Sequence, residues 1–333
     1  MKRIVVTGGA GFIGSNFVRY MLATYPDVHI VTFDKLTYAG NLDNLKDVDE
    51  RRHTFIKGDI ADKEAIKAAM EGCDAIVNFA AGSHVDRSIM GADDFIDTNV
   101  TGVYNICEAA RELRTPKVLL VSTDEVYGSI DEGSFTEEAP PRPGNPYSAS
   151  KAGGELIGLA HFNTFGTPII ITRGSNTYGP YQYPEKVLPL FVTNALDDEP
   201  LPLYSGGENN VRDWLYVEDH CRGIDTALEC GKPGEVYNIA GGNERRNIVL
   251  THKILELTGK APELIKPVKD RPGHDRRYSI DAAKLKALGW APCMDWDKGI
   301  ALTVQWYRDN EWWWRKIKTG EFLEYYRKQY LER

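Results

Sequence analysis

The sequence lacks an excess of positive charge. Lysine and arginine total 40 residues against 48 aspartates and glutamates, which gives a formal net charge of −8. Proteins that bind nucleic acid or anionic membranes through their general surface carry the opposite balance. No apolar run approaches the length of a membrane span, and the one after Arg3 ends at Gly8, too early for a signal peptide. We therefore expect neither a nucleic-acid partner nor a membrane partner.

Cysteine is also scarce. The chain has five, an odd number, spaced too widely for a zinc ribbon or a redox pair: Cys73, Cys107, Cys221, Cys230 and Cys293. His84 with Asp86 and His220 with Asp219 lack metal-ligand spacing, so we predict no metal site. Dispersed thiols are typical of a reducing compartment, and we expect a cytoplasmic protein.

What the sequence does contain is a regular alternation of strand and helix patterns. Its 333 residues suggest roughly two domains. Short runs rich in Val, Ile and Phe predict buried strands at 4–7, 28–34, 55–59, 75–80, 118–123 and 169–172. Helical patterns lie between them, for example at 12–22, 63–70, 94–113 and 148–165. This order predicts an α/β fold with a Rossmann-like, doubly wound parallel sheet and a smaller mixed α/β lobe.

A glycine-rich turn follows the first strand. The segment Gly8–Gly14 contains G-x-G-x-x-G from Gly9, and such glycines let the backbone approach a pyrophosphate at a helix N-terminus. By itself the pattern also fits a plain strand-to-helix turn. Asp34 ends the second strand about 20 residues later, where an acid binds the adenosine ribose. It favours NAD over NADP because a carboxylate repels a 2′-phosphate, although Lys35 weakens that preference.

Three acidic residues leave alternatives open. Asp59, followed by Ile60, closes the third strand and could reach the adenine, or it could cap the helix from Lys63. Asp124 and Glu125 follow the strand that ends in Val121-Ser122-Thr123. From spacing alone they are either an acid–base pair or solvated turn residues.

Tyr147 and Lys151 are spaced i, i+4 and share a helix face. There the ammonium would lower the pKa of the phenol and let Tyr147 act as a base near neutral pH, although a solvated helical pair has the same spacing. Downstream of a dinucleotide motif, this pattern resembles the short-chain dehydrogenase/reductase superfamily in its extended, nucleotide-sugar branch. Further segments are similar to the dTDP-glucose 4,6-dehydratases from Lys2 to about Trp314, namely 83–88, 123–128, 176–181, 184–186, 212–214 and 270–278.

The resemblance implies an internal redox cycle on dTDP-glucose with tightly bound NAD that rests as NAD+. Tyr147 would take the proton of the 4-hydroxyl while hydride leaves C4, with Thr123 bonded to the same oxygen. Glu125 would remove the C5 proton as Asp124 protonates the departing 6-hydroxyl, and hydride returns at C6. The catalytic residues so implied are Thr123, Asp124, Glu125, Tyr147 and Lys151.

The binding residues combine motif reading with the resemblance. For NAD they are Gly8, Gly11, Phe12, Ile13, Gly14, Asp34, Lys35, Leu36, Thr37, Gly40, Asp59, Ile60, Phe79, Ala80, Ala81, Ser83, Thr98, Val121, Tyr147, Lys151 and Asn176. For the sugar nucleotide they are Ser83, Thr123, Asp124, Glu125, Asn176, Lys186, Val187, Pro202, Tyr204, Arg212, Asn247, Arg271 and His274. Arg212 and Arg271 are suited to clamp the diphosphate, and the stretch 266–277 carries five cations against two acids.

The two lobes are expected to interleave in sequence. Prolines interrupt the alternation after Arg173, while 236–239 reads as a returning strand. We predict an NAD-binding domain at 1–175 with returning segments at about 211–240 and 275–305. The nucleotide-sugar lobe would comprise 176–210, about 241–274 and part of the C-terminal tail. The tail's tryptophans and tyrosines, at helical spacing, favour packing surface over a stacking platform for nucleic acid.

Three residues depart from the family pattern: Gly82, where glutamate is usual, and Gly174 and Thr177, where cysteine and asparagine are common. They leave open dehydration of UDP-, CDP- or GDP-glucose, or 4-epimerisation, for which the two acids would be superfluous. A catalytically inactive NAD-sensing or RNA-binding scaffold would have no need of Tyr147 and Lys151. The resemblance also suggests a homodimer through helices 94–113 and 148–165, with Val103, Leu156 and Leu159 on the buried faces.

Overall fold

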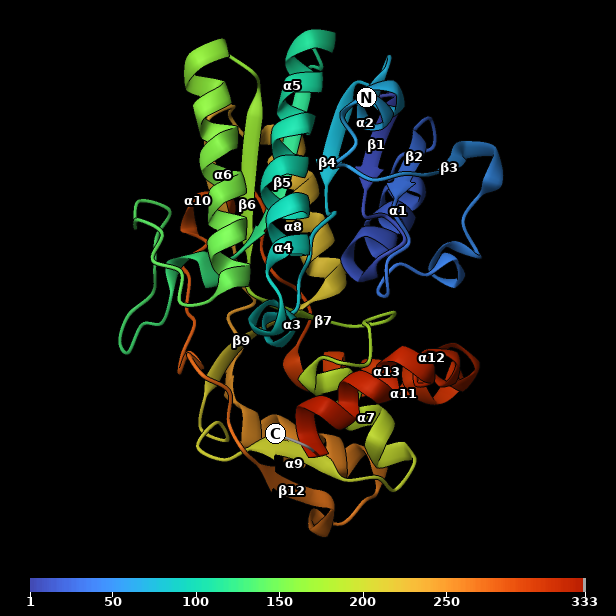
Figure 1. Cartoon of the computed structure of the whole chain (residues 1–333), viewed down its shortest axis with the longest axis vertical. Helices are drawn as coiled ribbons and strands as arrows, with labels where there is room; N and C mark the ends of the chain where they lie inside the picture. The colour runs from blue at the N-terminus through green and yellow to red at the C-terminus, as the bar shows by residue number, and fades with distance from the viewer. Residues whose placement is uncertain (332–333) are drawn as a thin grey trace.

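The computed structural model describes residues 1–331 and contains a seven-stranded sheet in which every neighbouring pair is parallel (Figure 1). The strand order is β10-β6-β5-β4-β1-β2-β3. The bounds are β1 (Arg3–Thr7), β2 (His29–Asp34), β3 (His53–Lys57), β4 (Ala75–Asn78), β5 (Lys117–Thr123), β6 (Ile169–Gly174) and β10 (Val236–Ile239). The chain reverses its direction of travel between β1 and β4, so the predicted doubly wound fold is confirmed.

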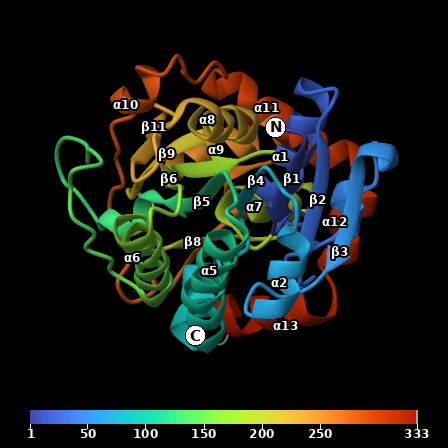
Figure 2. The same cartoon turned by 90° about the horizontal axis from the view of Figure 1, so that it is seen from above.

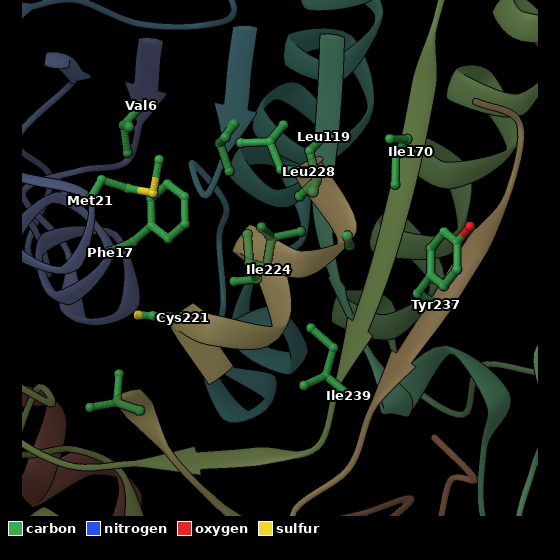
Figure 3. Packing of buried hydrophobic residues seen from close by; sticks show 14 of the residues in the cluster. Val6, Phe17, Met21, Leu119, Ile170, Cys221, Ile224, Leu228, Tyr237 and Ile239 are labelled. Carbon is green, nitrogen blue, oxygen red and sulfur yellow. The ribbon is translucent and has the colours of Figure 1, made fainter. Parts of the chain in front are cut away.

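Helices cover both faces of this sheet, as the view from above shows (Figure 2). One face carries α2 (Lys63–Met70), α5 (Val103–Leu113) and α6 (Pro146–Phe165), and the other carries α1 (Phe12–Thr24) and α8 (Val217–Cys230). In the core under α1 and α8, Phe17, Met21 and Ile224 pack towards sheet residues such as Leu119 and Ile239 (Figure 3). These side chains are fully buried, which makes the sheet a rigid support for the loops at its carboxyl edge.

The helical segment predicted at 94–113 is present, but it is not a regular α-helix throughout. The structure has α4 (Asp93–Ile96), then η3, a π-helical turn over Asp97–Gly102, and then α5. Within this turn the Asn99 side chain bonds both main-chain groups of Gly82, and a side-chain atom on Gly102 would lie 2.5 Å from Ile60. These long-range contacts account for the local distortion of the helix, which has the form of a π-bulge.

The second lobe has a three-stranded sheet, a two-stranded sheet and a helical cover (Figure 1). Its strands are β7 (Asn176–Tyr178), β8 (Leu201–Tyr204), β9 (Val211–Tyr216), β11 (Glu244–Arg246) and β12 (Ile265–Val268), and its helices are α7 (Val187–Leu196), α9 (Asn247–Thr258), α11 (Trp296–Asp309), α12 (Glu311–Ile317) and α13 (Gly320–Tyr326). Tyr307, Trp313 and Trp314 are buried in its core. The tail aromatics therefore pack, as the helical spacing predicts.

Only parts of the two predicted returning segments lie against the large sheet. The strand expected at 236–239 is β10, paired with β6 at the edge of the large sheet. Within the same expected segment, β9 instead pairs with β7 and β11 in the second lobe. Further on, α10 (Ala283–Lys286) contacts β10 and α8, whereas α11 packs on α7 and α9. The lobe boundaries themselves stay a prediction.

Among residues 1–331, no helix has the length and apolarity needed to cross a membrane.

Candidate active site

A cavity of about 640 Å³ opens at the carboxyl ends of the parallel strands. It is lined by every residue predicted to bind NAD except Leu36 and Asn176. Leu36 adopts a left-handed backbone conformation, with φ of 57°, and its amide hydrogen bonds Asp34. Asn176 belongs to β7 in the second lobe, with its side-chain oxygen buried and unpartnered.

The glycine turn shapes one wall of this cavity. Gly8 has φ of +66°, and a β-carbon there would lie 2.5 Å from the Ala80 nitrogen. The next wall residues, Phe12 to Gly14, are the first of α1, where backbone N–H groups have no intrahelical acceptor. These N–H groups are suited to bind a pyrophosphate.

Asp34 ends β2 and is nearly buried. Its carboxylate accepts from the backbone N–H of Ala10 at 2.9 Å and of Leu36 at 2.8 Å. Burial raises the pKa of Asp34, and those two N–H groups oppose the shift. The carboxylate is held at the cavity wall, in the place expected for a ribose contact.

Asp59 is not the cap of α2. That role belongs to Asp62, whose side chain accepts from two N–H groups of the first turn. The Asp59 carboxylate instead lies 2.7 Å from the ammonium of Lys35, and both residues line the cavity. The charge of Lys35 is thereby engaged, which reduces its ability to attract a 2′-phosphate.

The catalytic candidates converge from β5, the short turn η4 (Asp124–Tyr127) and α6. The helix α6 begins at Pro146 because the Asn145 and Ser148 side chains form a capping box, and this places Tyr147 in its first turn. The Thr123 hydroxyl donates to the Asp124 carboxyl at 3.2 Å and is a hydrogen-bond partner of the Tyr147 phenol.

The effect expected of Lys151 on the Tyr147 pKa stays a prediction, and the other surroundings of the phenol act in the opposite direction. Burial, followed by the nearby Glu125 and Asp124, raises the pKa of Tyr147, with Thr123 opposing. The Lys151 ammonium donates to the carbonyl of Val121 at 2.7 Å. Burial also lowers the pKa of Lys151 to about 8. These surroundings favour the neutral phenol.

Asp124 and Glu125 have unequal surroundings. Burial and then the Glu125 charge raise the pKa of Asp124 well above its ordinary value. Burial also raises the pKa of Glu125, but three cations oppose that shift, in order Lys186, Arg271 and Arg212. Each carboxyl group has one buried oxygen without a hydrogen-bond partner. Asp124 is therefore the acid that keeps its proton, and Glu125 is the one that ionises first.

The sugar-nucleotide candidates of the second lobe fall into two groups. The positive charges of Lys186 and Arg271 act on the Glu125 carboxylate and oppose the rise of its pKa. The Lys186 ammonium also donates to the Ser83 carbonyl at 2.8 Å. The Arg212 guanidinium is already engaged, because it donates to the backbone carbonyls of Val211, Asp275 and Arg276. Arg271 pairs with Asp86 at 3.5 Å, but one of its buried nitrogens has no partner, so Arg271 is the freer diphosphate donor.

The other candidates gather around β8. The rings of Tyr204 and His274 meet edge to face at 5.6 Å, and Asn247 donates to the Gly207 carbonyl while its buried oxygen lacks a partner. Pro202 is buried within β8, and Val187 is the first residue of α7.

Several site residues were missed by sequence reasoning. Arg87, on α3 (Val85–Met90), lines the cavity, donates to the buried Glu185 at 2.8 Å and stacks 3.7 Å from the Tyr38 ring centroid. Asp86 accepts from the Tyr204 hydroxyl at 3.2 Å. Asp86 and Arg87 lie in a motif that signalled the family, but their partners are about 100 or more residues away in sequence.

The model of the GDP-mannose 4,6 dehydratase family matches residues 5–303. The chain belongs to this family. It is 48% identical over 325 residues to a dTDP-glucose 4,6-dehydratase of Streptomyces niveus, with 96% of each chain covered. The solved DesIV dTDP-glucose 4,6-dehydratase of Streptomyces venezuelae, with NAD and TYD bound, has a TM-score of 0.93 and 51% identity, covering 95% of this chain and all of that one.

A solved epimerase is less similar to the chain. The UDP-glucose 4-epimerase of Thermus thermophilus, solved with NAD, has a TM-score of 0.85 and 33% identity, with 92% of this chain and 99% of that chain covered. The resemblance to dTDP-glucose 4,6-dehydratases is therefore confirmed.

Proposed function

We propose that the protein is an NAD-dependent dTDP-glucose 4,6-dehydratase. The observation that carries this proposal is the pair Asp124 and Glu125 beside Tyr147, each with an unpartnered carboxyl oxygen and with unequal electrostatic surroundings. Elimination of water needs one group that donates a proton and one that accepts a proton. A 4-epimerase has no use for such a pair.

The cavity fits NAD. Gly8 and the first turn of α1 would hold the pyrophosphate, and Asp34 would hold the adenosine ribose. When bound, NAD supplies the hydride acceptor for C4 of the sugar and the hydride donor for C6. The positive charge of the oxidised cofactor would oppose the rise in the pKa of the Tyr147 phenol.

The side chains then divide the proton transfers. Tyr147 takes the proton of the 4-hydroxyl. Thr123, which lies beside Asp124 and Tyr147, orients the 4-oxygen by hydrogen bonding. Glu125, the more readily ionised acid, removes the C5 proton, which a 4-keto group acidifies. Asp124, still protonated, gives its proton to the departing 6-hydroxyl. Lys186 and Arg271 would bind the sugar and the diphosphate from the second lobe.

The test is product analysis by chromatography and mass spectrometry. We expect dTDP-glucose to give dTDP-4-keto-6-deoxyglucose, with the UDP, CDP and GDP sugars turned over more slowly. A 4-epimer as the product would instead favour an epimerase, and preferred dehydration of UDP-, CDP- or GDP-glucose would change the nucleotide. Failure to consume any of the four sugars would refute the proposal.

We further propose a homodimer in the cytoplasm. Tyr104 on α5 and Leu156 and Phe165 on α6 are exposed apolar residues on neighbouring helices of one face. A second copy of this chain is the partner that would cover them. The expectation for Val103 is wrong, because it is buried in the core of its own chain. The five cysteines, which form no disulfide within residues 1–331, fit a reducing compartment.

A further inference from the structure

A buried ion pair lies behind Lys151. Glu155 follows it by one turn on α6 and pairs with Arg173 of β6. The Arg173 Nε lies 3.2 and 3.1 Å from the two carboxylate oxygens, and an Nη lies 2.5 Å from one of them. Both residues are only 3% exposed, and neither lines the cavity.

Stability is a weak reason for such a pair. Desolvation of two charges offsets most of their attraction, so apolar residues of similar size would stabilise the fold as well or better. Arg173 even has one buried nitrogen without a hydrogen-bond partner. Its guanidinium lies 4.5 Å from the ring centroid of Tyr127, which ends the η4 turn that carries Asp124 and Glu125. The pair thus joins the helix of Tyr147 to the turn of the two acids.

The pair also sets the electrostatic surroundings of Lys151. The Lys151 ammonium has one hydrogen bond in the structure, to the neutral Val121 carbonyl of β5. Burial disfavours its charge, and Glu155 is the group that opposes this effect. From η4, Asp124 and Glu125 act on Tyr147, while the neighbouring η3 turn contributes the neutral Asn99, bonded to Ser150. Arg173, from β6, donates to the Glu155 carboxylate and partly neutralises its charge.

We propose that Glu155 and Arg173 are positioning residues of the active site. The Glu155 carboxylate keeps Lys151 charged on the helix α6 that also carries Tyr147. Arg173 fixes that carboxylate in place and partly neutralises its charge. The inference deepens the proposed function, since it rests on the role proposed there for Tyr147.

The test is an NMR titration of the whole protein labelled with carbon-13 at lysine Cε, in which the Lys151 signal is assigned by its loss in Lys151→Arg. In Glu155→Gln the uncompensated Arg173 charge should lower the pKa of Lys151 by about one unit or more. Adding Arg173→Met to that variant should bring the value part of the way back. Glu155→Asp, which keeps the charge, should stay near the wild-type value.

A folded Glu155→Gln protein whose Lys151 titrates as in the wild type would overturn the inference, even if its melting temperature falls. Should that variant not fold, the neutral double variant decides: we expect a Lys151 pKa below the wild-type value, and an equal value is the contrary result. The titration needs no sugar. Its failure is therefore distinct from a failure of the wild-type protein to convert dTDP-glucose.

Discussion

Asp124 and Glu125 are adjacent in sequence, yet different neighbours decide their protonation. The Asp124 carboxyl faces a second carboxylate, and Glu125 faces the cations of the second lobe, Lys186 and Arg271 foremost. The two adjacent acids alone do not indicate which one keeps its proton, and only the resemblance assigned it to Asp124. The cations that make the difference lie some 60 to 150 residues further along the chain. The folded arrangement supplies the physical reason for that division.

Glu125→Gln tests this division. Oxidation at C4 relies on Tyr147 and should continue, so NADH should appear when dTDP-glucose is added. Removal of the C5 proton should slow by about 10²- to 10⁴-fold, because the amide cannot accept it. The measurements are NADH absorbance and formation of the 4-keto-6-deoxy product.

Glu132→Gln, at an exposed position in the loop that follows η4, is the matched control and should behave as the wild type. Absence of any reduced cofactor in Glu125→Gln, in a protein that still binds NAD, would contradict the order of the two steps.

The elements themselves were predictable where the signal is local. The strands at 4–7, 28–34, 118–123 and 236–239 appear within one residue at each end, because each is a short apolar run with polar or glycine boundaries. The π-helical turn within the helical segment at 94–113 was not predictable, since the contacts at this turn come from Gly82 and Ile60. The same holds for the candidate site. The glycine-rich cofactor turn could be predicted from a local pattern, whereas the Arg87–Glu185 pair joins residues that are 98 positions apart and could not.

The departures Gly174 and Thr177 have one structural explanation. Both contact the His220 ring of α8: a β-carbon at Gly174 would lie 2.6 Å from the imidazole, and the Thr177 hydroxyl is 2.7 Å from its Nδ1. The three residues thus fit one another across β6, β7 and α8. They are matched by packing, and they supply no group to the lining of the cavity.

His220 should therefore make stability depend on pH. Burial lowers its pKa to about 3, against about 6.5 in an unfolded chain. Between these values the unfolded state binds a proton that the folded state excludes, so the free energy of unfolding falls as pH falls below 6.5. In His220→Asn, where the amide can still bond Thr177, the loss between pH 7 and pH 5 should be about 2 kcal/mol smaller.

Urea unfolding at the two pH values measures this difference. His252→Asn, at an exposed helix position, is the matched control and should lose stability on acidification as the wild type does. Equal losses in His220→Asn and the wild type would mean that the buried imidazole does not resist protonation.

At the scale of the whole molecule, the exposed apolar residues of α5 and α6 remain to be covered. These helices stand side by side on the face of the sheet opposite α1 and α8, with Leu156 57% exposed and Phe165 55% exposed (Figure 2). The His161 ring of α6 packs edge to face against Tyr104 of α5 and Phe165 of α6, so these side chains hold one another in place. A stable dimer buries about 800 Å² on each partner, an area that two long neighbouring helices can offer.

Leu156→Asp should therefore convert a dimer into a monomer. A carboxylate at the middle of an apolar interface loses its hydration without gaining a partner, and this cost opposes association. Light scattering at micromolar concentration should give twice the mass of one chain for the wild type and the mass of one chain for this variant. Leu302→Asp, at a similarly exposed leucine on α11 in the second lobe, should remain dimeric. A monomeric wild type would refute the dimer. A Leu156→Asp protein that stays dimeric would place the interface away from α5 and α6, because Leu156→Asp alters that face and Leu302→Asp does not.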